Sequence, residues 1–392
     1  MRFLFSFWLI VLLPTFLFAQ TGSITGKVIA IDSKAALSKA SVFLSNATFG
    51  TVTADDGTFT LNNVKPGQYD LVVSILGYEN FTQTVLVGNK SQQLVIEMVP
   101  KMIQMKEVVI TTNANWKKNY ALFVKNFIGT SANSKLCKVL NPHVVNLVYH
   151  KKTQTLEAST DEFLVVENRA LGYKVQFLVH SFESSTLSNE IRYSGQVLFE
   201  ELKGGKSQQE KWKLKRQEAY YGSSMQFFRA LSHQDLQEQG FVMYQLQRKP
   251  NPKRPPEELL RQKYALFNKS NNRDSINYWN EKGQQPRFLE NLINVPLKPE
   301  DLVMRTDQAG LFALSFPDYL YVVYTKKHDE KIMNDIYRPL FMENYAVSVI
   351  TLFKKYALFD LNGVVVSPES TLFEGDWAND KLAELVPVDY TP

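Results

Sequence analysis

One short run of the sequence pairs a histidine and a glutamate at the spacing that zinc carboxypeptidases use. His180 and Glu183 form the motif H-x-x-E inside YKVQFLVHSFES. Such an enzyme also needs a distant second histidine for the metal and a further glutamate to activate water. The run alternates apolar and polar residues as a strand does, so His180 and Phe182 would share one face while Glu183 points to the other. We therefore expect an ordinary strand here and no metal site.

The rest of the chain offers little metal or cofactor chemistry. The other histidines lack the glycine-rich or acidic surroundings that such chemistry uses; they are His143, His150, His233 and His328. The sequence also has no G-x-G-x-x-G and no phosphate loop, the glycine-rich motifs that hold nucleotides. We predict neither a bound metal nor a cofactor.

Candidate nucleophiles are few. Cys137 is the only cysteine, which rules out an internal disulfide and a cysteine-based zinc site. It could act as a nucleophile beside His143, but a free cysteine near a helix end more often serves packing. The segment Gly222-Ser223-Ser224 lacks the second glycine and the preceding strand of a nucleophile elbow. We expect no catalytic residue among them.

Glycosidase chemistry would need two carboxylates that converge in space. Adjacent pairs occur at Glu200-Glu201 and Glu257-Glu258. Neighbouring residues diverge on a strand or a helix, so neither pair meets this need by itself. A hydrolase, metallocarboxypeptidases included, therefore stays an alternative rather than the main prediction.

The elements that would position any site begin after an export signal. Arg2 precedes an apolar run over residues 3–18, and the small Ala19 follows. This order predicts a secretory signal peptide over residues 1–19, cleaved after Ala19. An uncleaved anchor is the alternative, but the run is short for a membrane span and contains Pro14. We find no later apolar stretch long enough for a spanning helix.

Residues 22–98 alternate short apolar runs with turn residues. After Asp56-Gly57, Phe59 and Leu61 alternate with threonines, which is typical of a half-buried strand. Gly57 suits a tight connection because it takes a positive φ without strain. Pro66-Gly67 predicts a type II turn, with the positive φ at glycine. Six or seven such strands predict an antiparallel β-sandwich, with Tyr69 in its core.

The same stretch resembles a known family. The pattern T-x-x-D-G-x-F-x-L-x-x-V-x-P-G-x-Y-x-L-x-V-S-x-L-G-Y is similar to the carboxypeptidase regulatory-like domain of the transthyretin-like group. In that family the matching positions are turns and core, and none is catalytic. The resemblance therefore implies a structural role for Gly57, Phe59, Pro66, Gly67, Tyr69, Gly77 and Tyr78.

Residues 99–115 form a predicted linker. Within it, IQMKEVVITTN resembles the segment that follows a similar domain in TonB-dependent outer-membrane receptors. The segment could be a contact strand for an energising partner, or simply a last strand or linker, which we favour. Because too few residues follow for a plug and a 22-stranded barrel, we expect that the chain is not such a receptor.

Residues 116–392 predict a larger mixed, mostly antiparallel β domain with a few helices. Trp116, Tyr120, Phe123 and Phe127 recur at helical spacing and indicate a core-facing helix. Closely spaced strand-like runs follow, and their short connections favour antiparallel pairing. Four prolines in the segment 248–258 predict a long surface loop.

The C-terminal part carries two further patterns. Asn362-Gly363 predicts a hairpin turn, and residues 380–385 predict a short closing helix. The stretches 219–223 and 375–390 resemble, more loosely, the second part of uncharacterised exported proteins that begin with the regulatory-like domain. That likeness brings no activity with it.

Charge and composition limit the partners. The net charge is +5 at pH 7, without the concentrated basicity of a nucleic-acid binder. The densest basic cluster, residues 203–217, predicts a solvated helix face, with contact to an anionic surface as the alternative. We predict a non-enzymatic exported protein in the periplasm or at the outer membrane of a Gram-negative bacterium. Its partner would be an envelope protein or glycan, and peripheral membrane association stays open; an accessory role in TonB-linked uptake is the alternative.

Overall fold

A computed structural model describes residues 21–88, 91–101, 113–270, 272–308, 310–329 and 337–392. The predicted signal peptide, and the part of the EVVIT segment up to residue 112, lie outside the described residues. The fold is mainly β, as predicted, and divides into two compact units. The first contains residues 1–110 with 175–178 and 196–201, and the second contains the remainder.

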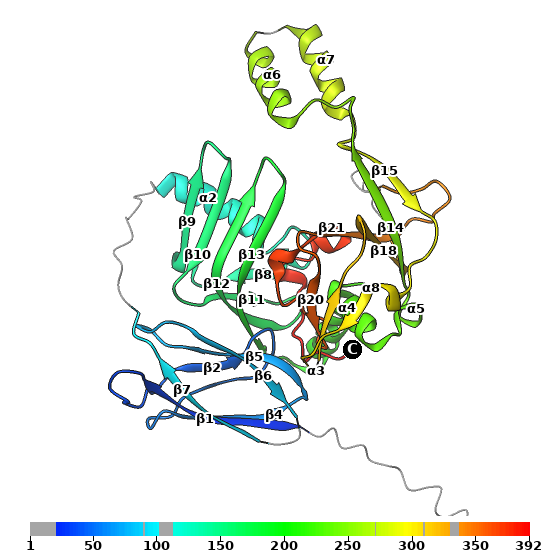
Figure 1. The fold of residues 1–392 in the computed structure, drawn as a ribbon. Helices are drawn as coiled ribbons and strands as arrows, with labels where there is room; N and C mark the ends of the chain where they lie inside the picture. The colour runs from blue at the N-terminus through cyan, green and yellow to red at the C-terminus, as the bar shows by residue number, and fades with distance from the viewer. Residues whose placement is uncertain (1–20, 89–90, 102–112, 271, 309, 330–336) are drawn as a thin grey trace, which may run out of the picture. The chain divides into compact units, whose positions relative to one another are not determined.

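The sandwich of the first unit has the predicted strands (Figure 1). They are β1 (Gly22–Ala30), β2 (Ser41–Leu44), β3 (Gly50–Val52), β4 (Thr58–Val64), β5 (Gly67–Ser74), β6 (Phe81–Val87) and β7 (Gln92–Met98). One sheet has the order β4-β1-β7 and the other β3-β2-β5-β6. Phe59, Leu61 and Tyr69 are buried between them, as the alternation predicts.

One strand pair differs from the prediction of a fully antiparallel sandwich. β7 lies parallel to β1, with Val28 opposite Ile96. The physical reason is the crossover before β7, because β6 belongs to the other sheet. After crossing, the chain arrives beside β1 in the same direction.

The predicted turn residues behave differently from one another. Gly57 has φ of 78°, and a Cβ there would lie 2.5 Å from the Val28 carbonyl oxygen, so glycine is required. The type II turn predicted at Pro66-Gly67 is wrong. Gly67 has an extended φ of 159° and pairs with Val87 as the first residue of β5, so the strand starts directly after Pro66.

Gly77-Tyr78, given above as turn or core positions, form a turn. Gly77 has φ of 88°. The Tyr78 backbone N–H donates to the Ile75 carbonyl at 3.2 Å, which closes the turn after β5.

The second unit begins with a helix and continues into a six-stranded sheet, although residues 175–178 and 196–201 of two of its strands are counted with the first unit. Its elements are α2 (Asn113–Phe127), η1 (Ser134–Leu136), β8 (Cys137–Val139), η2 (Pro142–Val144), β9 (Val145–His150), β10 (Thr155–Thr160), β11 (Leu164–Asn168), β12 (Tyr173–Ser185) and β13 (Glu190–Glu201). The strand order is β8-β11-β12-β10-β9, and β13 also pairs with β12. Phe123 and Phe127 of α2 pack edge-on against Phe182, at 5.0 and 5.9 Å between ring centroids. The aromatic stripe is therefore core, as predicted.

The later part of this unit holds a five-stranded sheet, β15-β14-β18-β19-β21, and a three-stranded sheet, β16-β17-β20. Its strands are β14 (Phe241–Pro250), β15 (Phe288–Ile293), β16 (Val303–Arg305), β17 (Leu311–Leu314), β18 (Tyr319–His328), β19 (Tyr345–Leu352), β20 (Ala357–Asp360) and β21 (Thr371–Gly375). Its helices are α3 (Lys206–Tyr220), α4 (Ser224–His233), α5 (Leu236–Gln239), α6 (Glu257–Ser270), α7 (Arg273–Gln284) and α8 (Pro299–Leu302). Short 3-10 turns are η3 (Pro368–Ser370), η4 (Asp376–Asn379) and η5 (Leu382–Glu384). None of the helices in the described residues is long and apolar enough to span a membrane.

Two predictions for this region need correction. The proline-rich segment is only partly a loop, because Arg248 to Pro250 complete β14 by pairing with β15 and Glu257 begins α6. Pro250 is tolerated because β18 pairs only as far as Leu246, which leaves the other side of the strand without a ladder partner among the described strands. The predicted closing helix is instead the pair of 3-10 turns η4 and η5.

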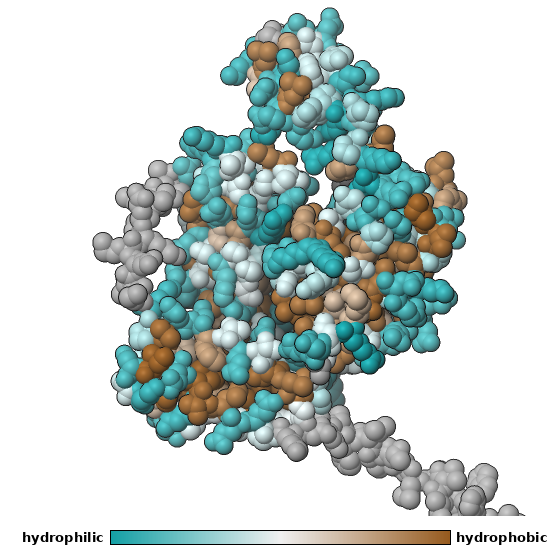
Figure 2. Space-filling view, viewed as in Figure 1, coloured by the Kyte–Doolittle hydropathy of each residue, from teal (hydrophilic) through white to brown (hydrophobic). Residues whose placement is uncertain are grey.

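The segment between β14 and β15 folds as a helical hairpin, which we call the α6–α7 arm (residues 257–284). It stands at the ends of these two strands, away from their sheet (Figure 1). Its visible surface is largely hydrophilic with separate apolar spots (Figure 2). The sequence patterns did not predict it.

Candidate functional site

The H-x-x-E motif lies on β12, as expected. His180 and Glu183 are both exposed, whereas Phe182 between them is buried against α2. Among the described residues, no group of three or more His, Cys, Asp or Glu side chains is placed to hold a metal ion. The motif therefore has no assembled metal site around it in the part of the chain that the structure describes.

Cys137, at the start of β8, is partly buried. Its Sγ lies 3.6 Å from the Asn133 carbonyl oxygen. Burial, assisted by the Glu384 carboxylate, raises the pKa of Cys137 to about 12. A thiol that keeps its proton at neutral pH is a poor nucleophile, so a catalytic role for Cys137 is not favoured, and its role in packing stays a prediction.

Ser223 and Ser224 have a structural task. The Ser223 side chain accepts a hydrogen bond of 3.2 Å from the Gln226 backbone N–H and caps α4, and Ser224 is the first residue of that helix.

The adjacent carboxylates engage separate partners. Glu257 pairs with Arg254 at 2.5 Å, while Glu258 pairs with Arg261 at 2.5 Å. In the other pair, Glu200 accepts from the amide of Gln176. The two members of the 257–258 pair thus face different arginines, as expected for neighbours on a helix.

A hollow that sequence reasoning missed lies at the β9–β10 hairpin. Its volume is about 510 Å³, and it opens to solvent. It is lined by His150, Lys151, Lys152, Thr153, Thr155, Glu157 and Glu183. We call it the hairpin hollow.

Strand register brings these residues together. His150 lies opposite Thr155 across the hairpin, and its Nε2 is 3.1 Å from a carboxylate oxygen of Glu157. Glu157 in turn lies opposite Glu183 on β12. Both members of the His150–Glu157 pair are about half exposed, so their attraction contributes little to stability. Directly opposed like charges are unfavourable on a sheet, so Glu157 and Glu183 are not explained by stability either.

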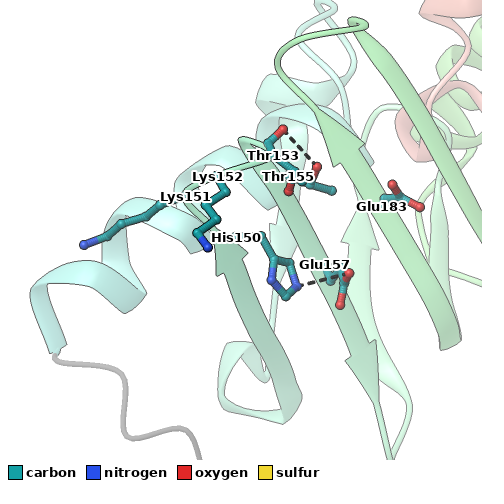
Figure 3. Close-up of a pocket in the computed structure, with 7 residues that line it drawn as sticks. All are labelled: His150, Lys151, Lys152, Thr153, Thr155, Glu157 and Glu183. Carbon is teal, nitrogen blue, oxygen red and sulfur yellow. Dashed lines mark hydrogen bonds and ion pairs between the residues drawn. The ribbon is translucent and has the colours of Figure 1, made fainter.

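The hollow combines donors and acceptors. Lys152 lies beside His150, whereas the side chain of Lys151 extends outward (Figure 3). Glu157 and Glu183 offer carboxylate acceptors on two neighbouring strands. Such a set can hydrogen-bond a polar or hydroxyl-rich ligand. Only the strand register shows that these residues meet.

The two C-terminal sequence patterns also come together. We call residues 376–390 the C-terminal strap. Trp377 Nε1 donates to the Gly222 carbonyl at 2.7 Å. Arg229 donates to the carbonyls of Val388 at 2.6 Å and Tyr390 at 3.1 Å. The segments 219–223 and 375–390 therefore hold each other in place, which is a structural role.

The middle of the strap joins it to the first part of this unit. Asn168 donates to the Ala383 carbonyl at 3.0 Å, and the Ala383 backbone N–H donates to Ile128 at 3.2 Å. Glu384 accepts from Ser131 at 2.5 Å and from Asn133 at 2.7 Å. The strap thus ties the C-terminus of α2 to the later sheets.

Asp380 lies in this strap among other charged groups. Burial, and then the neighbouring Asp376, raise the pKa of Asp380 well above its usual range, although Lys327 and Lys381 oppose the change. Burial and the Asp380 carboxylate also raise the pKa of Tyr193 on β13. These pKa shifts follow from the packing of the strap. Ionisation of Asp380 or Tyr193 is therefore expected to change the free energy of unfolding.

Residues 24–110 match the model of the CarboxypepD_reg-like domain, in agreement with the resemblance found in the sequence. No curated protein matches the chain. Among solved structures, the group B streptococcus pilus 2b backbone protein is 26% identical over 21% of this chain and 42% of that protein, with a TM-score of 0.19. The chain thus spans less than half of that pilus protein.

Two structures from Bacteroides species cover more. A DUF3823 family protein of Bacteroides ovatus is 14% identical over 47% of this chain and 100% of its own, with a TM-score of 0.17. A candidate membrane-associated protein of unknown function from Bacteroides fragilis is 10% identical over 91% of this chain and 98% of its own, with a TM-score of 0.18. Scores this low carry no argument about function.

Proposed function

We propose that this chain is a non-enzymatic exported protein of the cell envelope that binds a glycan or an envelope protein. The regulatory-like sandwich accompanies the larger domain, and the hairpin hollow of that domain is the binding site. The observation that carries this proposal is the set of lysine, threonine and glutamate side chains that line the hollow at the hairpin end of the six-stranded sheet.

The two faces of this sheet support the assignment. Phe182 and Leu156 are buried on the face that α2 covers. Glu157 and Glu183, one residue away on the same strands, are exposed on the opposite face. Two carboxylates opposite each other on a sheet repel and lower its stability. A ligand that donates hydrogen bonds to both Glu157 and Glu183 would relieve this repulsion.

The solvent-open form of the hollow favours binding over catalysis. Catalytic groups act in sites that exclude water, where electrostatic interactions are strong. His150 and Glu157 instead remain about half exposed. An open site with many hydrogen-bonding groups suits an extended polar ligand such as a glycan chain.

The test uses purified residues 21–392 on an array of bacterial envelope oligosaccharides, followed by calorimetry with any glycan retained. We expect the variant E157Q/E183Q to bind at least tenfold more weakly than the parent. E210Q, which changes an exposed glutamate on α3, is the matched control and should bind as the parent does. Unchanged binding by the double variant, or chemical turnover of the retained glycan, would refute the proposal.

Protein partners are tested in the same way in cells. A photo-crosslinker placed at Lys151 should capture an envelope protein if the ligand is a protein, and the capture should be weaker in E157Q/E183Q. Export itself is tested by fusing residues 1–25 to alkaline phosphatase, whose activity should appear only when the fusion leaves the cytoplasm.

A further inference from the structure

The α6–α7 arm contributes almost nothing to the hydrophobic core. α7 has no buried residue, and among the described side chains of α6 only Leu260 is buried. Packing in the core therefore does not explain why the chain contains this pair of helices, and we look for a role in binding.

Contacts within the arm and at its base connect its two helices. At its base, Arg254 donates to the carbonyl of Gln285 at 2.5 Å and pairs with Glu257. Between the helices, the Tyr264 hydroxyl donates to the Trp279 carbonyl at 2.9 Å. The Asn272 side chain caps α7 by accepting from the Ser275 backbone N–H at 3.1 Å. These bonds make the arm a defined projection.

Charge is distributed unevenly along the arm. At the base, Glu257 and Glu258 are neutralised by arginines. In the far part, residues 263–270 and 272–278, the charged residues are Lys263, Lys269, Arg273 and Asp274, so the net charge is +2. The far part is thus suited to an anionic partner.

Apolar and aromatic side chains lie near cations of the arm, both in the far part and beside it at Lys282. Leu266 is 56% exposed and Tyr278 is 52% exposed. Lys282 lies over the ring of Tyr278 at 5.5 Å, and Lys263 lies over the ring of Trp279 at 5.6 Å. Isolated apolar groups flanked by long cationic side chains, with tyrosine and tryptophan nearby, are typical of segments that enter a lipid headgroup region.

We propose that the far part of the α6–α7 arm docks on an anionic lipid surface. A surface that binds a protein usually carries its main contact residues in one contiguous cluster, which becomes buried at the centre of the interface. The exposed apolar side chains of the arm are instead separated by polar surface (Figure 2), which a fluid headgroup layer can accommodate. The docking is independent of the ligand of the hairpin hollow.

The experiment is co-sedimentation of residues 21–392 with vesicles of phosphatidylglycerol and phosphatidylcholine in equal parts, or of phosphatidylcholine alone. We expect binding to the anionic vesicles that is at least tenfold stronger than to the neutral ones, and that is lost in 1 M salt. Equal binding to both vesicles, or none to the anionic ones, would overturn the proposal.

Variants locate the contact. K269E/R273E should lose at least tenfold in vesicle binding, and L266S/Y278S should lose a similar amount, with unchanged circular dichroism. The matched control is K213E/L214S on α3, which changes an exposed lysine and a leucine that is 59% exposed. Loss of binding in the α3 variant but not in the arm variants would assign the contact to α3 and refute our proposal.

Discussion

The C-terminal strap and the α6–α7 arm both extend from the later sheets of the second unit, but they use their side chains in opposite ways. The strap inserts Trp377, Leu382 and Ala383 into the interior, where each is at most 5% exposed. The arm keeps Leu266 and Tyr278 in solvent. The difference indicates that the strap serves stability, whereas the arm is available for contact with something else.

The largest expected effect is on the strap. Trp377 packs against Phe227 and Phe373 and donates its indole N–H to Gly222. Trp377→Ala should lower the free energy of unfolding by about 3 to 5 kcal/mol, the range for large aromatic-to-alanine changes in cores. Urea denaturation measures it. Trp279→Ala in the arm is the control, and an equal loss there would remove the distinction between the two segments.

The next effect concerns the arginine that holds the end of the strap. Arg229 donates to the carbonyls of Asn362, Val388 and Tyr390. Arg229→Met should cost about 2 to 4 kcal/mol, because it leaves several partly buried carbonyls without a donor. Arg261→Met, in the arm, should change stability by less than about 0.5 kcal/mol. Comparable denaturation midpoints for the two variants would contradict the comparison.

A smaller effect, of opposite sign, is expected at Asp380. Because its pKa is raised in the folded state, its contribution to stability is complete below the ordinary carboxyl pKa of 3.8 and is lost as the pH rises through the folded value. Asp380→Asn should therefore stabilise the protein at neutral pH, by roughly 1.4 kcal/mol for every tenfold by which folding weakens this acid. Thermal unfolding from pH 4 to 8 should show a flatter profile than the parent. Asp274→Asn, in the arm, should leave the profile unchanged.

The smallest effect is predicted for the arm itself. Leu266→Ser should change the free energy of unfolding by less than about 0.5 kcal/mol, because the side chain is already exposed. A loss above about 1 kcal/mol would mean that Leu266 contributes to the stability of the fold, which would contradict our description of the arm. The same urea titration measures it.

Local patterns predicted much of the fold. The alternation around Phe59 and the spacing of Phe123 and Phe127 each report which face of an element is buried, and both agree with the structure. The type II turn at Gly67 failed because the pairing of β5 with β6 begins at that residue. The Pro-Gly motif by itself does not show that Gly67 pairs with the neighbouring strand.

The arm and the hairpin hollow were out of reach for a different reason. The prolines before Glu257 indicated a loop, and that interpretation left the two helices that follow without a prediction. In the hollow, Glu157 and Glu183 meet only through the register of two strands that are separated in sequence by β11. The pairing register of two strands that far apart in sequence cannot be predicted from the local residue pattern of either strand.

The parallel pairing of β1 with β7 has a consequence for how the protein is made. Ile24 pairs with Gln92, so in a growing chain one side of β1 stays unpaired until β7 has been made. Such an unpaired edge is a template for association with other chains. Stalled or truncated products that end before Gln92 should therefore be the species that proteases and chaperones recognise first.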